Sequence, residues 1–137
     1  MAARTEAYVD TPAFIAFLDR SDTDHELFAE LFSRPPALLT STLVIAEGHA
    51  WFLRRYDRSR ALQFLSFLES LTPLRIVSTG PQDLAAVYKL LRRFRDQDLT
   101  LADAMGLHLL GHHRIKSCWS TDPHLALTGV PLAGWGR

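Results

Sequence analysis

Short apolar runs alternate along this chain with longer stretches of helical periodicity, and prolines or helix-capping residues separate them. The apolar runs that predict β-strands cover residues 7–9, 38–39, 74–77, 117–119 and 130–132. Helices are expected from residue 11, over residues 25–32, 42–56, 58–71, 80–95 and 101–113, and from residue 123. Thr79 and Gln82 match a capping box at the start of the helix 80–95. Strands that alternate with helices predict an α/β fold, with a parallel central sheet covered by helices on both faces.

The whole chain, residues 1–137, is expected to form one domain, since a domain typically holds about 100–150 residues. No repeat, low-complexity stretch or Gly/Ser linker divides it. Cys118 is the only cysteine, which excludes an internal disulfide and fits a reducing compartment. The sequence has neither an apolar signal segment nor a run of about 20 uncharged residues. We therefore expect a cytoplasmic protein that does not contact a membrane.

Charge restricts how this chain could hold a nucleic acid. Its formal net charge is zero, with 15 basic and 15 acidic residues, whereas nucleic-acid-binding domains are usually strongly basic. Contacts to RNA phosphates would have to come from local arginine clusters or from a partner, and the alternative for such clusters is a solvated helix face. The clustered arginines are Arg54, Arg55, Arg58, Arg60, Arg92, Arg93 and Arg95.

Two aspartates follow predicted strands. Asp10 comes directly after the run 7–9, and Asp122 lies shortly after the run 117–119. Ligand sites in open parallel sheets form beyond the carboxyl ends of the strands. Each aspartate also precedes a helix that starts with proline, so each has the alternative role of an N-cap.

Glu47 and Asp103 lie on predicted helices. Glu47 has apolar neighbours one helical turn away, so we expect it to be at least partly buried, either beside a metal or in a salt bridge. Asp103 lies three residues after Thr100, which matches a capping box. Gly106 and Leu107, one turn further on, suggest that this side of the helix faces inward.

These four carboxylates predict a magnesium site if they converge. Clustered carboxylates repel one another unless a divalent cation lies between them, and magnesium prefers a few carboxylate oxygens together with water. Such a cation activates water and stabilises charge on a phosphate. An unrelated α/β protein in which all four acids are helix caps is the alternative.

Four segments, in order, resemble the motifs of PIN domains. Residues 8–11 (Tyr-Val-Asp-Thr) resemble the first motif, and residues 41–47 resemble the second, in which an acid follows a Ser/Thr-rich helix start. Residues 99–104 (Leu-Thr-Leu-Ala-Asp-Ala) are very similar to the third, and residues 120–122, with His124, resemble the fourth. Together these motifs span nearly the whole chain.

The resemblance implies roles for particular residues. Asp10, Glu47, Asp103 and Asp122 correspond to the catalytic, metal-binding acids of the family. Accessory residues are also implied, namely two hydroxyls that orient water or a carboxylate and one extra acid: Thr11, Ser120 and Asp98. The chain departs from the family pattern at Pro12, where relatives often have Ser or Asn, and at Ser120, where Thr is usual. Neither departure removes an acid.

Among PIN proteins of this size, the chain resembles the VapC toxins, the ribonuclease halves of bacterial toxin–antitoxin pairs. The resemblance implies an endoribonuclease that depends on Mg²⁺, with Mn²⁺ able to substitute. It further implies an RNA substrate, a VapB-like antitoxin, a homodimer, and contact with DNA only through the antitoxin. The alternative within the family is an inactive PIN-like module that binds RNA or protein.

Three other groups have simpler explanations. His108 and His112 have the i, i+4 spacing of a zinc site, but no HExxH pattern accompanies them, and histidines favoured by the helix C-terminus are the better explanation. Cys118, between predicted strand residues, is expected to be a small buried apolar side chain. Aromatic residues near the end of the third predicted helix are expected in the core or at an interface, where an antitoxin would dock: Trp51, Phe52 and Tyr56.

Overall fold

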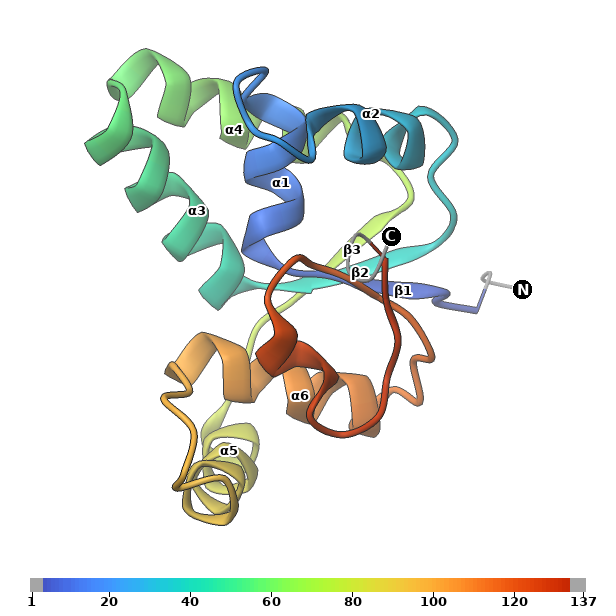
Figure 1. Ribbon diagram of the computed structural model, residues 1–137, viewed down its shortest axis with the longest axis vertical. Helices are drawn as coiled ribbons and strands as arrows, with labels where there is room; N and C mark the ends of the chain where they lie inside the picture. Colours follow the sequence, from blue (N-terminus) through green and yellow to red (C-terminus); the bar gives the residue numbers. More distant parts are fainter. Residues whose placement is uncertain (1–3, 134–137) are drawn as a thin grey trace.

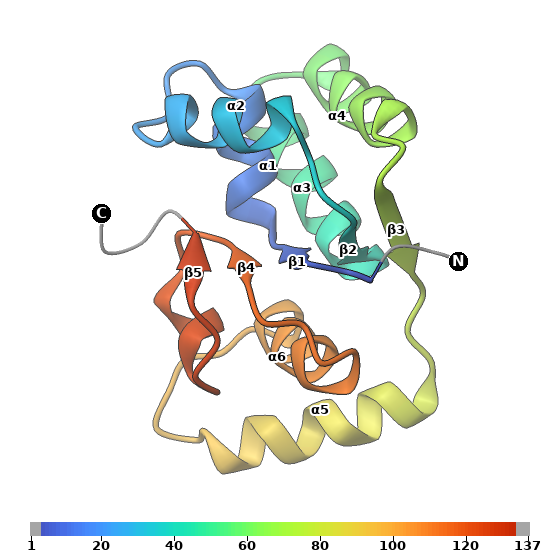
Figure 2. The same cartoon turned by 90° about the vertical axis from the view of Figure 1, so that its right-hand side faces the viewer.

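A computed structural model describes residues 4–133 of the chain and shows a three-layer α/β sandwich (Figures 1 and 2). Helices α1 to α4 cover one face of the central sheet, and α5 and α6 cover the other. The strands are β1 (Ala7–Val9), β2 (Leu38–Ser41), β3 (Leu74–Val77), β4 (Cys118–Trp119) and β5 (Leu132–Ala133). The helices are α1 (Thr11–Leu18), α2 (His25–Ser33), α3 (Thr42–Arg55), α4 (Arg58–Ser70), α5 (Pro81–Arg93), α6 (Leu101–His112) and the short 3₁₀ helix η1 (Pro123–Ala126).

The sheet is parallel throughout, with the strand order β3-β2-β1-β4-β5. The first strand therefore lies in the middle, between β2 and β4. Tyr8 pairs with Leu39 on one side and with Cys118 on the other. Because all strands run the same way, the residues that follow β1 and β4 emerge at one edge of the sheet. This confirms the predicted α/β class with helices on both faces.

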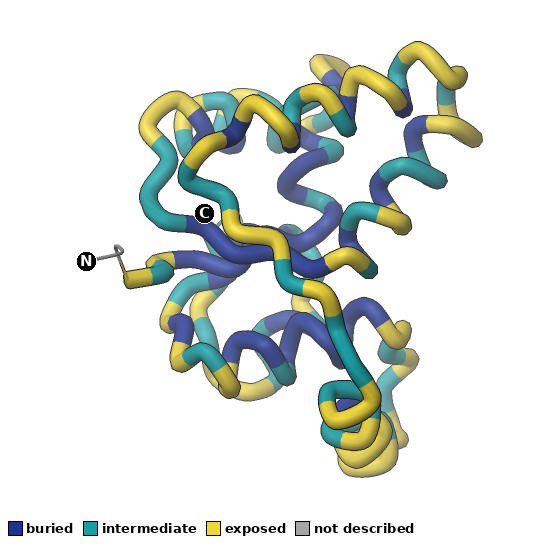
Figure 3. The backbone as a smooth tube through the Cα atoms, turned by 180° about the vertical axis from the view of Figure 1, so that it is seen from behind, coloured by how far each residue is buried: buried dark blue, intermediate teal, exposed yellow. Residues whose placement is uncertain are grey.

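The core lies between the sheet and each helical layer (Figure 3). On one side, aromatic rings from α1, α2 and α4 pack together; the Phe14 ring centroid is 5.7 Å from those of both Phe32 and Phe64. On the other side, α6 is buried along most of its length, as the burial pattern of Ala102 to Leu110 indicates. Such burial of aromatic and aliphatic surface drives folding.

Gly106 allows α6 to approach the sheet closely. A Cβ at this position would lie 2.8 Å from Leu125 Cδ1 and 3.1 Å from Tyr8 Cε1. Such a Cβ would require the Leu125 side chain, the Tyr8 ring or α6 itself to shift. The glycine thus helps to set the distance between Asp103, one turn earlier on α6, and the strand ends.

The sequence placed the start and end of α5 incorrectly. The predicted capping box of Thr79 and Gln82 is wrong, since the cap residue is Gly80 and its N–H donates to Asp83 Oδ2 at 3.0 Å. The helix ends at Arg93, two residues before the predicted end. A carboxylate accepts a backbone hydrogen bond more strongly than an amide oxygen does, which favours Asp83 in this role. Within residues 4–133, no helix has the length and apolar character needed to span a membrane.

Candidate metal site

Asp10 lies at the carboxyl end of the central strand and is buried, with 2% of its surface exposed. Its N–H donates to the Trp119 carbonyl at 3.0 Å, which ties the end of β1 to β4. Its Oδ2 accepts a hydrogen bond from Ser120 Oγ at 2.8 Å. Although Asp10 is the N-cap residue of α1, its side chain makes no capping hydrogen bond. The cap alternative therefore does not explain this carboxylate.

Burial raises the pKa of Asp10 to about 7. Hydrogen bonds from Ser120 and from the Thr11 backbone lower it, whereas the negative charges of Asp103 and Glu47 raise it further. Every ion pair among the described residues involves a histidine, and none of them includes Asp10. A buried carboxylate surrounded by other acids and without a cation is costly to ionise. Such a perturbed carboxylate at the end of a strand is a candidate functional acid.

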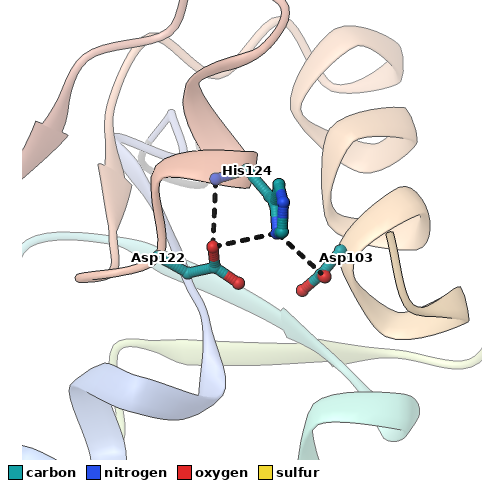
Figure 4. Close-up of side chains that lie close together, drawn as sticks. All are labelled: Asp103, Asp122 and His124. Atoms are coloured by element: carbon teal, nitrogen blue, oxygen red, sulfur yellow. Dashed lines mark hydrogen bonds and ion pairs between the residues drawn. The ribbon is translucent and has the colours of Figure 1, made fainter. Parts of the chain in front are cut away.

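Asp103, Asp122 and His124 point toward one another at the same edge (Figure 4). One ligand atom from each lies within 4.8 Å of those of the other two. The Nδ1 atom of His124 is 3.2 Å from Asp122 Oδ1 and 3.7 Å from Asp103 Oδ2. Burial and the charge of Asp122 raise the pKa of Asp103. Hydrogen bonds with Thr100 and the electrostatic effect of His124 act in the opposite direction.

Asp103 and Asp122 are also helix caps, as the alternative interpretation proposed. Thr100 N–H donates to Asp103 Oδ2 at 3.1 Å, and His124 N–H donates to Asp122 Oδ1 at 3.0 Å. Each cap occupies one carboxylate oxygen. Because a carboxylate has two oxygens with two lone pairs each, capping orients these side chains without excluding a metal. The two roles are compatible in this fold.

Glu47 is exposed, so the prediction that it is at least partly buried is wrong. The buried stripe of α3 consists of Val44, Gly48 and Phe52, on a different side of the helix. Gly48 is buried because α4 packs closely there, and a Cβ would lie 2.6 Å from Phe64 Cζ. Glu47 instead faces an open groove of about 420 Å³ and remains near enough to Asp10 to raise its pKa.

The two accessory hydroxyls are buried beside Asp10, and the accessory acid is not. Ser120 Oγ donates to Asp10 and accepts from Asp122 N–H at 3.0 Å, so it links the two carboxylate segments. Thr11 is 4% exposed, and its Oγ1 has no hydrogen-bond partner among the described residues. Asp98 is exposed in the loop before α6.

The arginines divide into three groups. Arg54 and Arg55 line the groove next to Glu47, together with Ala50 and Trp51. Arg60 is used in the fold, since it donates to the Leu18 carbonyl at 2.9 Å and lies over the Tyr56 ring. The remaining predicted arginines are exposed on α4, at the end of α5 or just beyond it: Arg58, Arg92, Arg93 and Arg95.

Two further side chains have structural explanations. His108 Nε2 lies 2.8 Å from Asp83 Oδ1, so a carboxylate on α5 already engages one of the two histidines with zinc-like spacing. Cys118 is fully buried, and burial raises the pKa of its thiol. This confirms the expectation of a small buried side chain rather than a nucleophile.

His124 was not assigned a role from the sequence, although it appears in the fourth motif. The only local signal is its position two residues after Asp122. Its approach to Asp103 depends on the way η1 folds over the start of α6, which is a tertiary feature.

Comparison with known proteins identifies the family of this chain. The family model described as the PIN domain matches residues 7–130. The chain belongs to the PIN-domain family. That match covers all four segments that resembled PIN motifs, from Asp10 at the end of β1 to Asp122 after β4.

The similar proteins cover most of this chain. Ribonuclease VapC26 of Mycobacterium tuberculosis is 24% identical, over 92% of this chain and 93% of the relative. The crystal structure of VapC20 from the same organism, described as a sarcin-ricin-loop-cleaving toxin, superposes with a TM-score of 0.83. It is 21% identical and covers 91% of this chain and 96% of that one. DNA-bound VapBC of Salmonella typhimurium has a TM-score of 0.63 at 15% identity, covering 93% and 96%. These structural likenesses support the single PIN-like α/β fold.

The donor atoms at the sheet edge fit a divalent cation. Carboxylate and imidazole groups are common metal ligands, and three such side chains already face one another here. The unpartnered Thr11 hydroxyl beside Asp10 fits a site completed by water or an ion. Acids that raise one another's pKa are stabilised in the ionised form by an added positive charge.

Proposed function

We propose that this protein is a metal-dependent endoribonuclease that hydrolyses RNA phosphodiester bonds with Asp10, Glu47, Asp103 and Asp122. The observation that carries the proposal is the buried Asp10 carboxylate, which has acidic neighbours and a pKa raised to about 7. Mg²⁺ is the proposed cofactor, with Mn²⁺ able to replace it. Bound there, the cation would help to activate water and stabilise charge on the phosphate.

The residues of the site have distinct tasks in this proposal. Ser120 holds the Asp10 carboxylate in a fixed orientation through its 2.8 Å hydrogen bond. The Thr11 hydroxyl, which is free of protein partners among the described residues, orients water. Glu47 faces the groove from the exposed side, where Arg54 and Arg55 would contact the phosphates that flank the scissile bond. Asp98 has only an outer electrostatic role, because it is exposed outside the cluster.

Cleavage of an RNA oligonucleotide in Mg²⁺ and in EDTA tests this function. Asp103→Asn should abolish Mg²⁺-dependent cleavage while the circular dichroism spectrum stays native. Asp83→Asn is the matched control, because Asp83 has the same capping-box position on α5 and lies outside the cluster. Wild-type cleavage by Asp103→Asn, in preparations free of other nucleases, would overturn the proposed site.

The physiological role that we propose is that of a toxin in a VapBC-type pair. Support comes from the similarity to VapC26 and VapC20 and from the fold shared with the DNA-bound VapBC complex. In this role the chain forms a homodimer and a VapB-like antitoxin covers the site. DNA is contacted only through the antitoxin. The groove beside Trp51 is the proposed docking surface, and a basic side chain of the antitoxin would pair with the exposed acids.

Expression in a bacterial host tests the toxin role separately from the chemistry. Induction of the wild-type chain should arrest growth, Asp103→Asn should not, and co-expression of the product of the adjacent gene should restore growth. If induction of an active wild-type nuclease is harmless and the neighbouring gene product does not bind it, the ribonuclease stands without the toxin role.

A further inference from the structure

Among residues 4–133, His124 is the side chain that brings a nitrogen donor to the cluster of Asp103 and Asp122. It lies on η1 two residues after Asp122, and its ring turns back toward the start of α6 (Figure 4). The ring nitrogen that faces the carboxylates is Nδ1. The side chain is 30% exposed, so it is held by its contacts with the acids rather than enclosed by the core.

The local backbone fixes the position of this imidazole relative to Asp122. The carboxylate of Asp122 caps η1 by accepting the His124 N–H at 3.0 Å. The same carboxylate oxygen is 3.2 Å from His124 Nδ1. The turn therefore places a backbone donor and a ring nitrogen of one residue on one carboxylate, and the third donor, Asp103, comes from α6.

The spacing of these donors suits a single octahedral ion. Two ligands at about 2.1 Å from such an ion are about 3 Å apart when adjacent and about 4.2 Å apart when opposite. The measured separations from Nδ1, 3.2 Å to Asp122 and 3.7 Å to Asp103, lie between these values. Both measured separations therefore fall within the range that two ligands of one ion span.

The chemistry of nitrogen distinguishes this site from one made of oxygens alone. Mg²⁺ prefers oxygen ligands, whereas imidazole favours first-row transition ions, and their affinity rises from Mn²⁺ through Fe²⁺ to Co²⁺. We propose that His124 is a direct nitrogen ligand of the catalytic ion and makes this site prefer transition ions to Mg²⁺. This inference rests on the proposed function. Mg²⁺ still binds through the carboxylates, but less tightly.

Pulsed electron paramagnetic resonance of the Mn²⁺-loaded full-length protein tests the ligand directly. The wild-type spectrum should contain modulation from a ¹⁴N nucleus bound to Mn²⁺. His124→Phe, which keeps a planar ring without a donor, should lose it, and the control His112→Phe, on the exposed end of α6, should keep it. A wild-type spectrum without nitrogen modulation would overturn the inference and leave the four-acid function intact.

Calorimetric titration with Co²⁺ and Mg²⁺ measures the preference. His124→Asn offers an amide oxygen in place of the nitrogen, so the ratio of Co²⁺ to Mg²⁺ affinity should fall about tenfold or more. An unchanged ratio would show that His124 only forms ion pairs with the acids. If the folded wild type binds none of Mn²⁺, Co²⁺ and Mg²⁺, both this inference and the proposed metal-dependent function are wrong.

Discussion

The two ends of α1 each have a buried aspartate, and the pKa values of the two side chains are shifted in opposite directions. Asp10, at the N-terminal end, is 2% exposed, and burial raises its pKa to about 7. Asp19, at the C-terminal end, is 7% exposed, and its pKa lies below the usual value. The helix dipole would produce the opposite order, since it favours negative charge at the N-terminus. Burial therefore decides the direction of the Asp10 pKa shift, and hydrogen-bond donors together with Arg60 decide that of Asp19.

Asp19 is surrounded by donors. Burial acts to raise its pKa, but hydrogen bonds from Ser21 and Tyr56 and the charge of Arg60 outweigh this effect. Its Oδ1 accepts from Ser21 N–H at 3.0 Å and Ser21 Oγ at 2.6 Å, and its Oδ2 accepts from Tyr56 Oη at 2.8 Å. This carboxylate stabilises the junction of α1 with α3 and α4 in its ionised form.

Asp10 accepts one side-chain hydrogen bond, from Ser120, and the charged side chains that shift its pKa are both acids, Asp103 and Glu47. Such an arrangement costs stability whenever the carboxylate is ionised. An incoming cation would supply the missing charge. The comparison indicates that burial alone does not mark a candidate functional acid, whereas burial among other acids does.

The largest expected effect separates the two aspartates by activity. Asp10→Asn should lower RNA cleavage on the order of a hundredfold to a thousandfold, because an amide cannot supply the negative charge that a cation requires. Asp19→Asn should retain activity within about threefold when assayed well below its melting temperature. Initial rates with a fluorescent RNA substrate measure both. Equal losses of RNA cleavage in the two variants would show that Asp10 and Asp19 do not differ in their importance for activity.

The second effect is on stability, and its sign differs between the two ends. In EDTA at pH 8, Asp19→Asn should lower the free energy of unfolding by about 2 kcal/mol, because donors to a charged acceptor lose their partner. Asp10→Asn should raise it by a comparable amount, on the order of 2 kcal/mol, because repulsion and desolvation of the carboxylate are removed. Urea unfolding monitored by tryptophan fluorescence gives both values. Destabilisation by Asp10→Asn would contradict this account.

The third effect is the pH dependence of the metal-free protein. Folded Asp10 keeps its proton up to about pH 7, whereas the unfolded chain releases it near pH 4. Between these values the folded state binds more protons, so the contribution of Asp10 to stability is fully present below pH 4 and is lost as the pH rises to about 7. The free energy of unfolding of Asp10→Asn should therefore exceed that of the wild type by an amount that grows from pH 4.5 to pH 7 and then levels off. Parallel stability profiles for the two proteins would show that Asp10 has an ordinary pKa.

The smallest effect concerns Tyr56. Tyr56→Phe removes one hydrogen bond to Asp19 and keeps the ring over which Arg60 lies. We expect a loss of about 1 kcal/mol in the free energy of unfolding. RNA cleavage and the Mn²⁺-induced rise in melting temperature should not change, because the contact lies at the far end of α1 from the acids. If Tyr56→Phe lost the Mn²⁺-induced rise in melting temperature, the Asp19 end of α1 would be coupled to the acids at its Asp10 end.

Local signals explain how much of the fold the sequence could predict. Thr100 and Asp103 form the expected capping box, with Thr100 Oγ1 accepting the Asp103 N–H at 3.0 Å, because both residues belong to one turn. Strands β1 and β3 were equally visible as short apolar runs. The start of α5 was misplaced because Thr79 with Gln82 and Gly80 with Asp83 have the same spacing.

The sequence predicted that Asp10 and Asp122 follow strand ends, but it did not predict the surroundings of the candidate acids. The exposure of Glu47 was missed because the side of α3 that packs against α4 includes Gly48, which has no side chain to reveal it as buried. His124 was missed because its approach to Asp103 joins two elements far apart in the sequence. Asp19 gave no signal at all, since its partners Tyr56 and Arg60 come from distant segments.

Anomalous diffraction from crystals soaked in Mn²⁺ would locate the ion without assuming any activity. We expect a strong peak at the carboxyl edge of the sheet, within about 2.0–2.5 Å of carboxylate oxygens of Asp103 and Asp122 and close to Asp10. The peak should be absent in Asp103→Asn and present in Asp19→Asn. An edge without a peak in well-diffracting wild-type crystals, or a peak confined to other surface acids, would contradict the proposed metal site.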